Sequence, residues 1–398
     1  PGAFRLMTEF TIASFNVKNL IGPDREYYTF QSYTPEEYAW KRMWLADQLV
    51  SLNADVVAFQ EVFEEDALRD VIAHADVEGR AENEDHVPAR DKRYCRRAIF
   101  DKLEYDPYHQ AALAFAPNAS DGASGARRPG VAILSRLGFS APVQIIQDLD
   151  PPVDIALKDG PGGVYTLSRV SRPILKTRVP MGGTDVTVIT CHLKSKLGEY
   201  PHSDDAEFAP EADLTDYDPL GRALGAARAA MRRMAEAWVL RREIVEELEA
   251  DRPVIVLGDF NDGENAVSSE IISGEVPFVN YAWMLRHDAK TPQDRYSEAE
   301  HTQITQAIGA MRLHSAEKLF VAKSLRDMVY TTSFGGVYES IDQIYLSRHF
   351  LGDIGEMMYY SVFNDHLTDG SHPEAPYNKL ASDHGQIMAH IRMTKGSA

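Results

Sequence analysis

The sequence predicts an α/β fold, a layered sandwich of β-sheets and helices around one core. Apolar stretches of strand length dominate the 398 residues, and several of them end on a polar residue. Helical patterns do not follow every strand, as a parallel βαβ repeat would require. No internal repeat or low-complexity segment is visible. These observations favour a layered sandwich over a parallel βαβ repeat.

The N-terminal part of the chain predicts two strands and two helices. Residues 9–17 alternate apolar and polar side chains, which indicates a strand. Residues 34–53 predict a helix because Thr34 can cap it and apolar residues recur at helical spacing. Residues 54–62 predict a buried strand, and residues 64–75 predict a second, short helix.

The remaining elements are mostly strands. We expect them at residues 108–116, 130–136, 172–181, 184–196, 253–262, 340–347 and 382–391. Two glycines between the third and fourth of these predict a hairpin. One long helix is expected at about residues 217–250.

The chain is expected to form a single domain over residues 7–398. Residues 1–6, "PGAFRL", precede Met7 and are interpreted as a cloning remnant. Three surface insertions are predicted at about residues 76–106, 199–218 and 263–335. The first contains a dense basic stretch, the second has eight acids and no Lys or Arg, and the third contains apolar helical patterns. Stretches with this much charge are usually solvated surface loops.

Composition narrows the function. Two cysteines exclude a disulfide framework and a four-thiolate zinc site. No apolar run is long enough to span a bilayer, and no signal peptide is visible, so we expect a cytoplasmic chain without a membrane span. The formal net charge is −19, without the basic excess of a non-specific nucleic-acid binder. A phosphate substrate would therefore need metal ions and a local Arg/Lys cluster.

Polar residues recur where the predicted strands end. A lone Asp there is usually a turn residue or a cap, and a lone His is usually structural. A set of eight spread over nearly the whole chain indicates a shared site instead. The eight residues are Asn16, Glu61, His192, Asp259, Asn261, Asp342, Asp383 and His384.

The motifs around these residues resemble a known family. "SFNVKNL", "FQEV", "RPGVAILSR", "CHLKSK", "LGDFND", "SIDQIYLS" and "SDH" occur in the order found in the endonuclease/exonuclease/phosphatase superfamily. Each motif alone is weak, but the ordered set covers almost the whole chain. The resemblance implies a deoxyribonuclease I-like fold, a four-layer α/β sandwich of two packed mixed sheets flanked by helices. It also implies a metal-dependent hydrolase of phosphoric esters.

The resemblance assigns metal ligands to this sequence. Glu61 matches the family's main metal carboxylate, Asn16 would bind metal or phosphate beside it, and Asp383 could contact a second metal. Mg²⁺ or Mn²⁺ is expected because such hard cations prefer carboxylate and amide oxygens. Several relatives carry an acid where this chain has Lys18. We therefore expect one tight metal site and at most a weak second one.

The resemblance also assigns catalytic roles. Asp259 would orient or deprotonate the attacking water, and Asn261, two positions on, would contact a phosphate oxygen. His384 would contact the phosphate or take the proton of the water, with Asp342 orienting it. His192 would bind phosphate or help the leaving oxygen depart.

Arg127 or Arg128 could clamp a phosphate oxygen. Lys194 and Lys196 are weaker candidates, because most surface lysines are simply solvated.

Two substrate classes remain open. A nuclease that cuts DNA or RNA is favoured by the "HLKSK" pattern and by the basic stretch 89–97. A phosphodiesterase or phosphatase for a small ester is favoured by the net charge of −19 and by the acidic stretch 199–218. No obligate protein partner is evident. A non-catalytic scaffold is disfavoured because the metal-binding and water-orienting residues are all present, namely Glu61, Asp259, Asn261 and His384.

Overall fold

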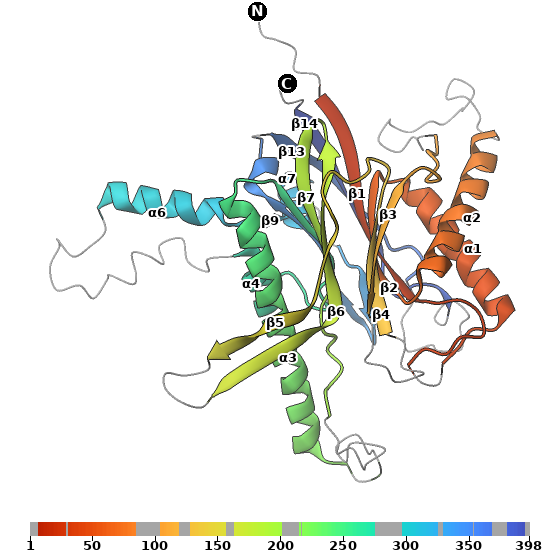
Figure 1. Ribbon diagram of the computed structural model, residues 1–398, viewed down its shortest axis with the longest axis horizontal. Coiled ribbons are helices and arrows are strands. Elements are labelled where there is room, and N and C mark those ends of the chain that lie inside the picture. Colours follow the sequence, from red (N-terminus) through yellow and green to blue (C-terminus); the bar gives the residue numbers. More distant parts are fainter. Residues whose placement is uncertain are drawn as a thin grey trace, which may run out of the picture.

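Two packed β-sheets with helices on their outer faces form the protein (Figure 1). The computed structural model describes residues 7–28, 31–84, 104–118, 128–156, 163–200, 215, 217–274, 297–324, 329–352, 354–367 and 380–394. The basic stretch 89–97, most of the acidic stretch 199–218, and Arg127 lie outside these residues.

The first sheet has six strands in the order β13-β14-β1-β2-β4-β3. β1 and β2 run parallel, and the other neighbours are antiparallel, so the sheet is mixed. Its strands are β1 (Met7–Leu20), β2 (Val56–Val62), β3 (Ala112–Asn118), β4 (Arg128–Ser135), β13 (Gly355–Phe363) and β14 (Gln386–Thr394).

The second sheet has six strands in the order β5-β6-β7-β8-β12-β9, with β7 and β8 parallel. Gly182 and Gly183 join β6 and β7 with positive φ angles of 61° and 87°, which confirms the predicted hairpin. The strands are β5 (Gln144–Ala156), β6 (Val164–Met181), β7 (Thr184–His192), β8 (Val254–Asp259), β9 (Leu313–Ser315) and β12 (Asp342–Ser347). A separate hairpin joins β10 (Thr332–Phe334) and β11 (Val337–Glu339).

Helices complete four layers, and three apolar clusters hold them together. One cluster packs α1 (Pro35–Leu52) and α2 (Glu65–Glu84) on the first sheet. The second lies between the two sheets. The third packs α3 (Pro219–Glu249) and α4 (Val267–Ser273) on the second sheet. The expected four-layer sandwich of two mixed sheets is therefore confirmed.

Local signals account for the helices that were predicted correctly. Thr34 caps α1 in a capping box with Glu37, as the sequence indicates. Asp218 caps α3 by accepting from the backbone N–H groups of Leu220 and Gly221. α2 continues to Glu84, beyond the predicted end at residue 75, so the start of the first predicted insertion is helical.

The sequence analysis missed several elements. β5 and β13 were not expected. The region 263–335, expected as an insertion, contributes β9 to the edge of the second sheet through pairing with β12. It also contains α6 (Glu298–Ala310) and α7 (Ala316–Ser324), followed by β10. Part of this region is therefore built into the sandwich, and residues 275–296 lie outside the described residues.

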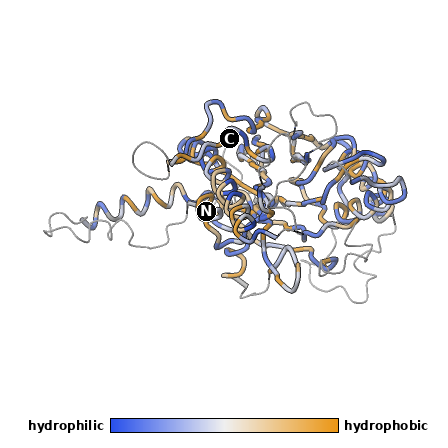
Figure 2. Tube along the Cα trace, turned by 90° about the horizontal axis from the view of Figure 1, so that it is seen from below, coloured by the Kyte–Doolittle hydropathy of each residue, from blue (hydrophilic) through white to orange (hydrophobic). Residues whose placement is uncertain are grey.

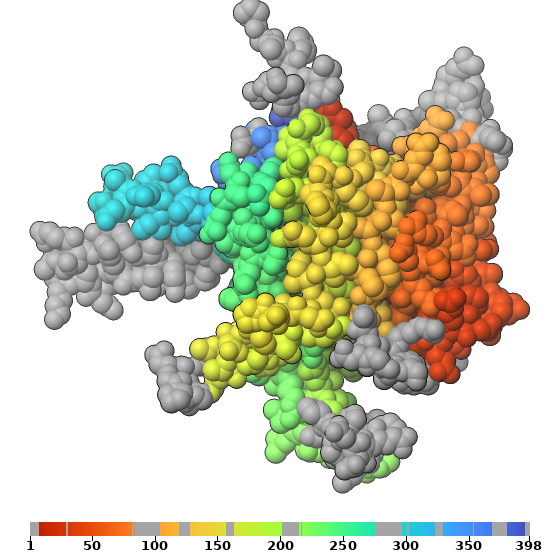
Figure 3. Space-filling model, viewed as in Figure 1, coloured from red at the N-terminus to blue at the C-terminus, as the bar shows by residue number. Residues whose placement is uncertain are grey.

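Two features project from the layers. The helix α6 extends away from the body, with hydrophobic and hydrophilic residues mixed along it (Figures 1 and 2). The far halves of β5 and β6 form an arm that projects near the N-terminal part of α3 (Figure 3). Among the described residues, no helix is long and apolar enough to cross a membrane.

Candidate active site

The site lies where the ends of strands from both sheets meet. In the second sheet, Asp259 at the end of β8 is in register with His192 of β7 and with Asp342 of β12. In the first sheet, Asn16 of β1 pairs with Gln60, the neighbour of Glu61. The Asn16 side chain reaches the second sheet, where Nδ2 donates to Asp259 Oδ2 at 3.0 Å. The strand pairing thus brings residues distant in sequence to one place.

Backbone irregularities aim several of these side chains. Glu61 has a φ of 63° at a register shift in β2, and Asn261 has a φ of 54° just after β8. Residues with positive φ that are not glycine are uncommon, and bulges of this kind often redirect side chains beside active sites. Gly258 has a φ of 149°, and a Cβ there would lie 2.1 Å from the Cys191 carbonyl oxygen. Glycine therefore permits the close approach of β7 and β8 below His192 and Asp259.

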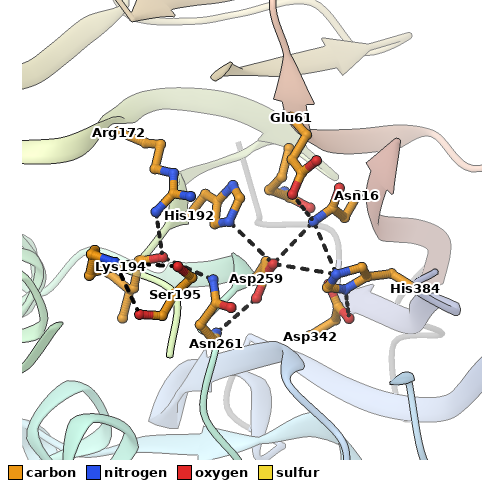
Figure 4. A network of polar contacts seen from close by, with 12 residues as sticks. Asn16, Glu61, Arg172, His192, Lys194, Ser195, Asp259, Asn261, Asp342 and His384 are labelled. Carbon is orange, nitrogen blue, oxygen red and sulfur yellow. Dashed lines mark hydrogen bonds and ion pairs between the residues drawn. The ribbon is translucent and has the colours of Figure 1, made fainter. Parts of the chain in front are cut away.

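Asp259 is the centre of the polar network (Figure 4). Its side chain is buried, and its Oδ1 accepts from the backbone N–H of Asn261 at 2.8 Å. Oδ2 lies 3.3 Å from His192 Nε2 and 3.7 Å from His384 Nε2. Burial raises the pKa of Asp259 to about 7; His384 opposes this shift and Asp342 adds to it. A carboxylate in this range can accept a proton near neutral pH.

Asp342 and His384 form a hydrogen-bonded pair. His384 Nδ1 lies 2.8 Å from Asp342 Oδ2, and the backbone N–H groups of Ile341 and Asp342 donate to Thr331 Oγ1. Burial opposes protonation of His384, but Asp342 and Asp259 raise the pKa of the imidazole well above its usual value. The geometry therefore favours an imidazolium that presents Nε2–H toward Asp259.

His192 lies on the other side of Asp259 and is fully enclosed. Burial lowers the pKa of His192 well below its usual value, and Arg172 and His384 act in the same direction. A neutral imidazole that donates from Nε2 to Asp259 fits this environment, with the buried Nδ1 left as an acceptor. In this arrangement His192 supports Asp259.

Arg172 is a site residue that the sequence analysis missed. Its Nη1 donates to the Leu193 carbonyl at 3.2 Å, and Asn261 Nδ2 donates to the same oxygen at 2.9 Å (Figure 4). Arg172 lies inside the 18-residue strand β6, not at a strand end. The other site residues were found because polar residues follow the ends of predicted strands, and Arg172 does not. The available signal was its place at the start of the predicted strand 172–181.

The remaining predicted residues lie farther out. Arg128 begins β4 and is exposed. The Asp383 side chain is 59% exposed and ion-pairs with Lys18 Nζ at 3.4 Å. Lys194 Nζ donates to the Leu197 carbonyl at 2.8 Å, and Lys196 ion-pairs with Glu339. Of the two arginines predicted to clamp a phosphate oxygen, only Arg128 lies among the described residues. The structure adds Arg172 as a further candidate for this role.

The residues present suit a divalent cation with oxygen ligands. Asn16 Nδ2 donates its two hydrogens to Glu61 Oε1 at 3.3 Å and Asp259 Oδ2 at 3.0 Å, while Asn16 Oδ1 accepts only one hydrogen bond among the described residues, from the Lys18 N–H. Asp259, Asp342 and His384 also place ligand atoms within 4.8 Å of one another. The Asp342–His384 hydrogen bond occupies two of those atoms. The Glu61 carboxylate and the neighbouring side-chain oxygen of Asn16 are then the oxygen donors that fit Mg²⁺ or Mn²⁺.

Comparison with known proteins identifies the family of this chain. The model of the Endonuclease/Exonuclease/phosphatase family matches residues 13–384, nearly the whole chain. The chain belongs to this family. The resemblance expected from the motifs is thereby confirmed, and the family consists of enzymes that hydrolyse phosphoric esters, generally with divalent metals. No curated protein matches the chain.

Solved structures of low identity are similar to the whole chain. The family protein from Bacteroides vulgatus shares 12% identity, with a TM-score of 0.47 and coverage of 97% of this chain and 99% of its own. The human Nocturnin catalytic domain, solved with a sulfate anion, shares 13%, with a TM-score of 0.45 and 97% coverage of both chains. Truncated TDP2 from Caenorhabditis elegans shares 12%, with a TM-score of 0.41 and coverage of 96% and 97%.

Proposed function

We propose that the protein is a divalent-metal-dependent phosphodiesterase that cuts a DNA or RNA backbone. The observation that carries the proposal is the placement of Asp259. This carboxylate is buried, held by Asn261 and His192, and faces Asn16 and His384. Glu61 lies beside Asn16. A water-activating carboxylate beside a cation site is the arrangement that in-line attack on a phosphodiester requires.

The side chains have distinct parts in the proposed reaction. The water oxygen bonds to phosphorus while the bond from phosphorus to the leaving oxygen breaks, and Asp259 accepts the proton of the water. The His384 imidazolium donates from Nε2 to a phosphoryl oxygen, and Asp342 keeps it charged and oriented. Glu61 and Asn16 would hold a divalent cation, which would supply positive charge to offset the negative charge on the phosphoryl and leaving oxygens.

The arginines near the site favour a polymeric phosphate substrate. Arg172 is held at the Leu193 carbonyl, next to Asn261. Farther along, Arg232 of α3 donates to the Arg169 carbonyl at 3.2 Å, and Arg228 donates to the Glu199 carbonyl at 3.5 Å. Arg232 also ion-pairs with Glu199 and Glu236 at 3.4 Å each, so Arg172 is the arginine beside the reaction centre that best suits a phosphate of a nucleic-acid backbone.

The net charge of −19 favours a second candidate, a small phosphate ester such as a phospholipid head group, a nucleotide or an organophosphate. A negatively charged enzyme repels a long polyanion at low salt unless local cations offset the repulsion. A small ester experiences much less of this field. Ionic strength therefore separates the two candidates, because cleavage of a polymer held by several phosphate contacts falls steeply with salt.

A paired assay tests the proposal. One arm offers plasmid DNA, single-stranded DNA and RNA; the other offers bis-p-nitrophenyl phosphate and p-nitrophenyl phosphate. Each arm is run with Mg²⁺, with Mn²⁺ and with EDTA, for the wild type and for Asp259→Ala and Asp259→Asn. We expect metal-dependent cleavage of nucleic acid, with a loss of about 10²- to 10⁴-fold in both variants.

The outcomes separate the candidates. Rapid hydrolysis of the small esters while the polymers stay intact would move the protein to the small-ester class. Turnover that is unchanged in folded Asp259→Ala would contradict the assignment of Asp259. Wild-type protein that cleaves neither set with either metal would contradict the proposal as a whole.

A further inference from the structure

A lysine lies beside the site, at the irregular end of β1. Lys18 and Asn19 have φ angles of 48° and 54°, at the register shift that follows Asn16. This turn ties the backbone to the site, because the Lys18 N–H donates to Asn16 Oδ1 at 3.0 Å and the Asn19 N–H donates to Glu61 Oε2 at 2.9 Å. The position of Lys18 is therefore fixed by the same bonds that orient Asn16 and Glu61.

The Lys18 side chain faces the other end of the chain. Its Nζ lies 3.4 Å from Asp383 Oδ2, and the side chain is only 20% exposed. Asp383 immediately precedes His384, whose backbone N–H is held by Ser382 Oγ at 3.0 Å. The ammonium thus lies between the segment that carries Asn16 and the segment that carries His384.

A second lysine lies behind the same two segments. Lys41 of α1 is fully buried, and its Nζ donates to the Val17 and Leu380 carbonyls at 3.0 Å each. Val17 is the neighbour of Lys18, and Leu380 precedes the loop of Asp383. Lys41 therefore ties the two segments together, and the Lys18 ammonium is the charge that a divalent ion on the Asp383 side of the site would meet.

The carboxylates of the site differ in their ion pairs. Asp342 pairs with His384, Asp259 lies near both His192 and His384, and Asp383 pairs with Lys18. Within the described part of the chain, no lysine, arginine or histidine forms an ion pair with Glu61. Glu61 is consequently the carboxylate whose charge remains for an external cation.

We propose that Lys18 is a built-in cation that occupies the Asp383 side of the site and restricts the chain to one divalent ion, bound at Glu61. This inference rests on the proposed function in that it takes the site to bind a divalent ion at all. Beyond that function, the inference assigns the ion to the Glu61 side of the site and the exclusion of a second ion to the Lys18 side chain.

The number of bound ions tests this proposal without reference to turnover. Mn²⁺ is titrated into the full chain and followed by calorimetry and by the electron paramagnetic resonance signal of free Mn²⁺. The variants are Lys18→Glu, which replaces the ammonium with a carboxylate, and Lys18→Gln, which removes the charge only. Lys318→Glu on α7 is the matched control, since it makes the same charge change at an exposed lysine away from the site.

We expect one Mn²⁺ per chain for the wild type and for Lys318→Glu, and two for Lys18→Glu. Lys18→Gln should bind a second Mn²⁺ at least tenfold more tightly than the wild type does. If Lys18→Glu does not fold, as judged by circular dichroism, Lys18→Gln decides the question.

Two tight Mn²⁺ ions in the wild type would overturn the role of Lys18 and leave the proposed function standing. The role of Lys18 would also be overturned if both folded variants bound a single Mn²⁺ and Lys18→Gln bound a second Mn²⁺ no more tightly than the wild type does. No Mn²⁺ binding by the wild type would contradict the metal-dependent function itself, and this inference with it.

Discussion

The Ser382 hydroxyl donates a hydrogen bond of 2.6 Å to the carbonyl of Asn16, although 366 positions separate the two residues in the chain. Both residues are buried. The same hydroxyl oxygen accepts from the backbone N–H of His384 at 3.0 Å. One serine thus fixes the distance between the N-terminal strand that carries Asn16 and the C-terminal loop that carries His384.

Removal of this hydroxyl should therefore weaken both the fold and the site. We expect Ser382→Ala to lower the free energy of unfolding by about 1–3 kcal/mol, because the Asn16 carbonyl and the His384 N–H each lose a buried partner. Turnover should fall as well, since His384 loses a fixed position. Urea unfolding and the metal-dependent assay measure the two effects. Ser140→Ala, in an exposed bend, is the control and should change neither.

Glu61 should control metal activation rather than stability. Glu61→Gln keeps the shape of the side chain but removes the charge that faces Asn16. We expect the metal concentration for half-maximal activity to rise by about 10- to 100-fold or more, since even the loss of an outer partner of a metal ligand has this effect. Glu65→Gln on the exposed face of α2 should leave the curve unchanged. A large drop in the thermal midpoint of Glu61→Gln would instead indicate a structural role.

Glu236 of α3 connects the two backbone segments that carry Arg172 and His192. The Glu236 side chain is buried, and Oε1 accepts from the Ser171 N–H at 2.7 Å and from Ser171 Oγ at 2.5 Å. Oε2 accepts from the Lys194 N–H at 2.8 Å. Glu236 is therefore a positioning residue. It holds Ser171, next to Arg172, and Lys194, next to Leu193, so that Arg172 can reach the Leu193 carbonyl.

Substitution of Glu236 by Gln should disturb substrate binding more than the chemical step. The glutamine amide would place its own N–H groups against one of two backbone donors, leaving that donor unsatisfied. We expect KM to rise several-fold while kcat changes less, because Arg172 is displaced and Asp259 is not. Steady-state kinetics at several metal concentrations measure this split. Glu249→Gln, at the exposed end of α3, is the control. A fall in kcat at constant KM would contradict this role.

Local patterns account for the elements that the sequence predicted well. Thr34 and the helical spacing after it defined α1, and the apolar run before Asp259 defined β8. Such signals are contained in a few neighbouring residues. The exposed strand β5 lacks a regular burial pattern, so periodicity could not indicate it.

The geometry of the site depends on contacts that no local pattern contains. Asp259 meets His192 and Asp342 because three strands pair in one register. Asn16 reaches Asp259 only because two sheets pack together. The residue types and the strand-end rule could nominate these positions, but the family resemblance was needed to assign roles. Arg172 was missed because it begins the predicted strand 172–181, whereas the other site residues were found where predicted strands end; the observed strand β6 already begins at Val164.

Lys41 gives the protein a pH-dependent stability that is separate from the chemistry. Burial lowers the pKa of Lys41 to about 7, against 10.5 for a lysine free in water, and nearby Lys18 acts in the same direction. Between these two pH values the unfolded chain binds a proton that the folded chain does not. Folding therefore becomes more favourable as pH rises through this window, by up to about 1.4 kcal/mol per pH unit. Below pH 7 both states hold the proton, and this dependence disappears.

Urea unfolding of the wild type and of Lys41→Met at pH 7.5 and pH 9 measures this contribution. Between the two pH values the wild type should gain about 2 kcal/mol more stability than Lys41→Met, because methionine carries no titrating group and leaves the other groups in place. Lys318→Met, which removes an exposed lysine, should behave like the wild type. Equal pH dependence in wild type and Lys41→Met would mean that Lys41 stays protonated in the folded chain, held by the carbonyls of Val17 and Leu380.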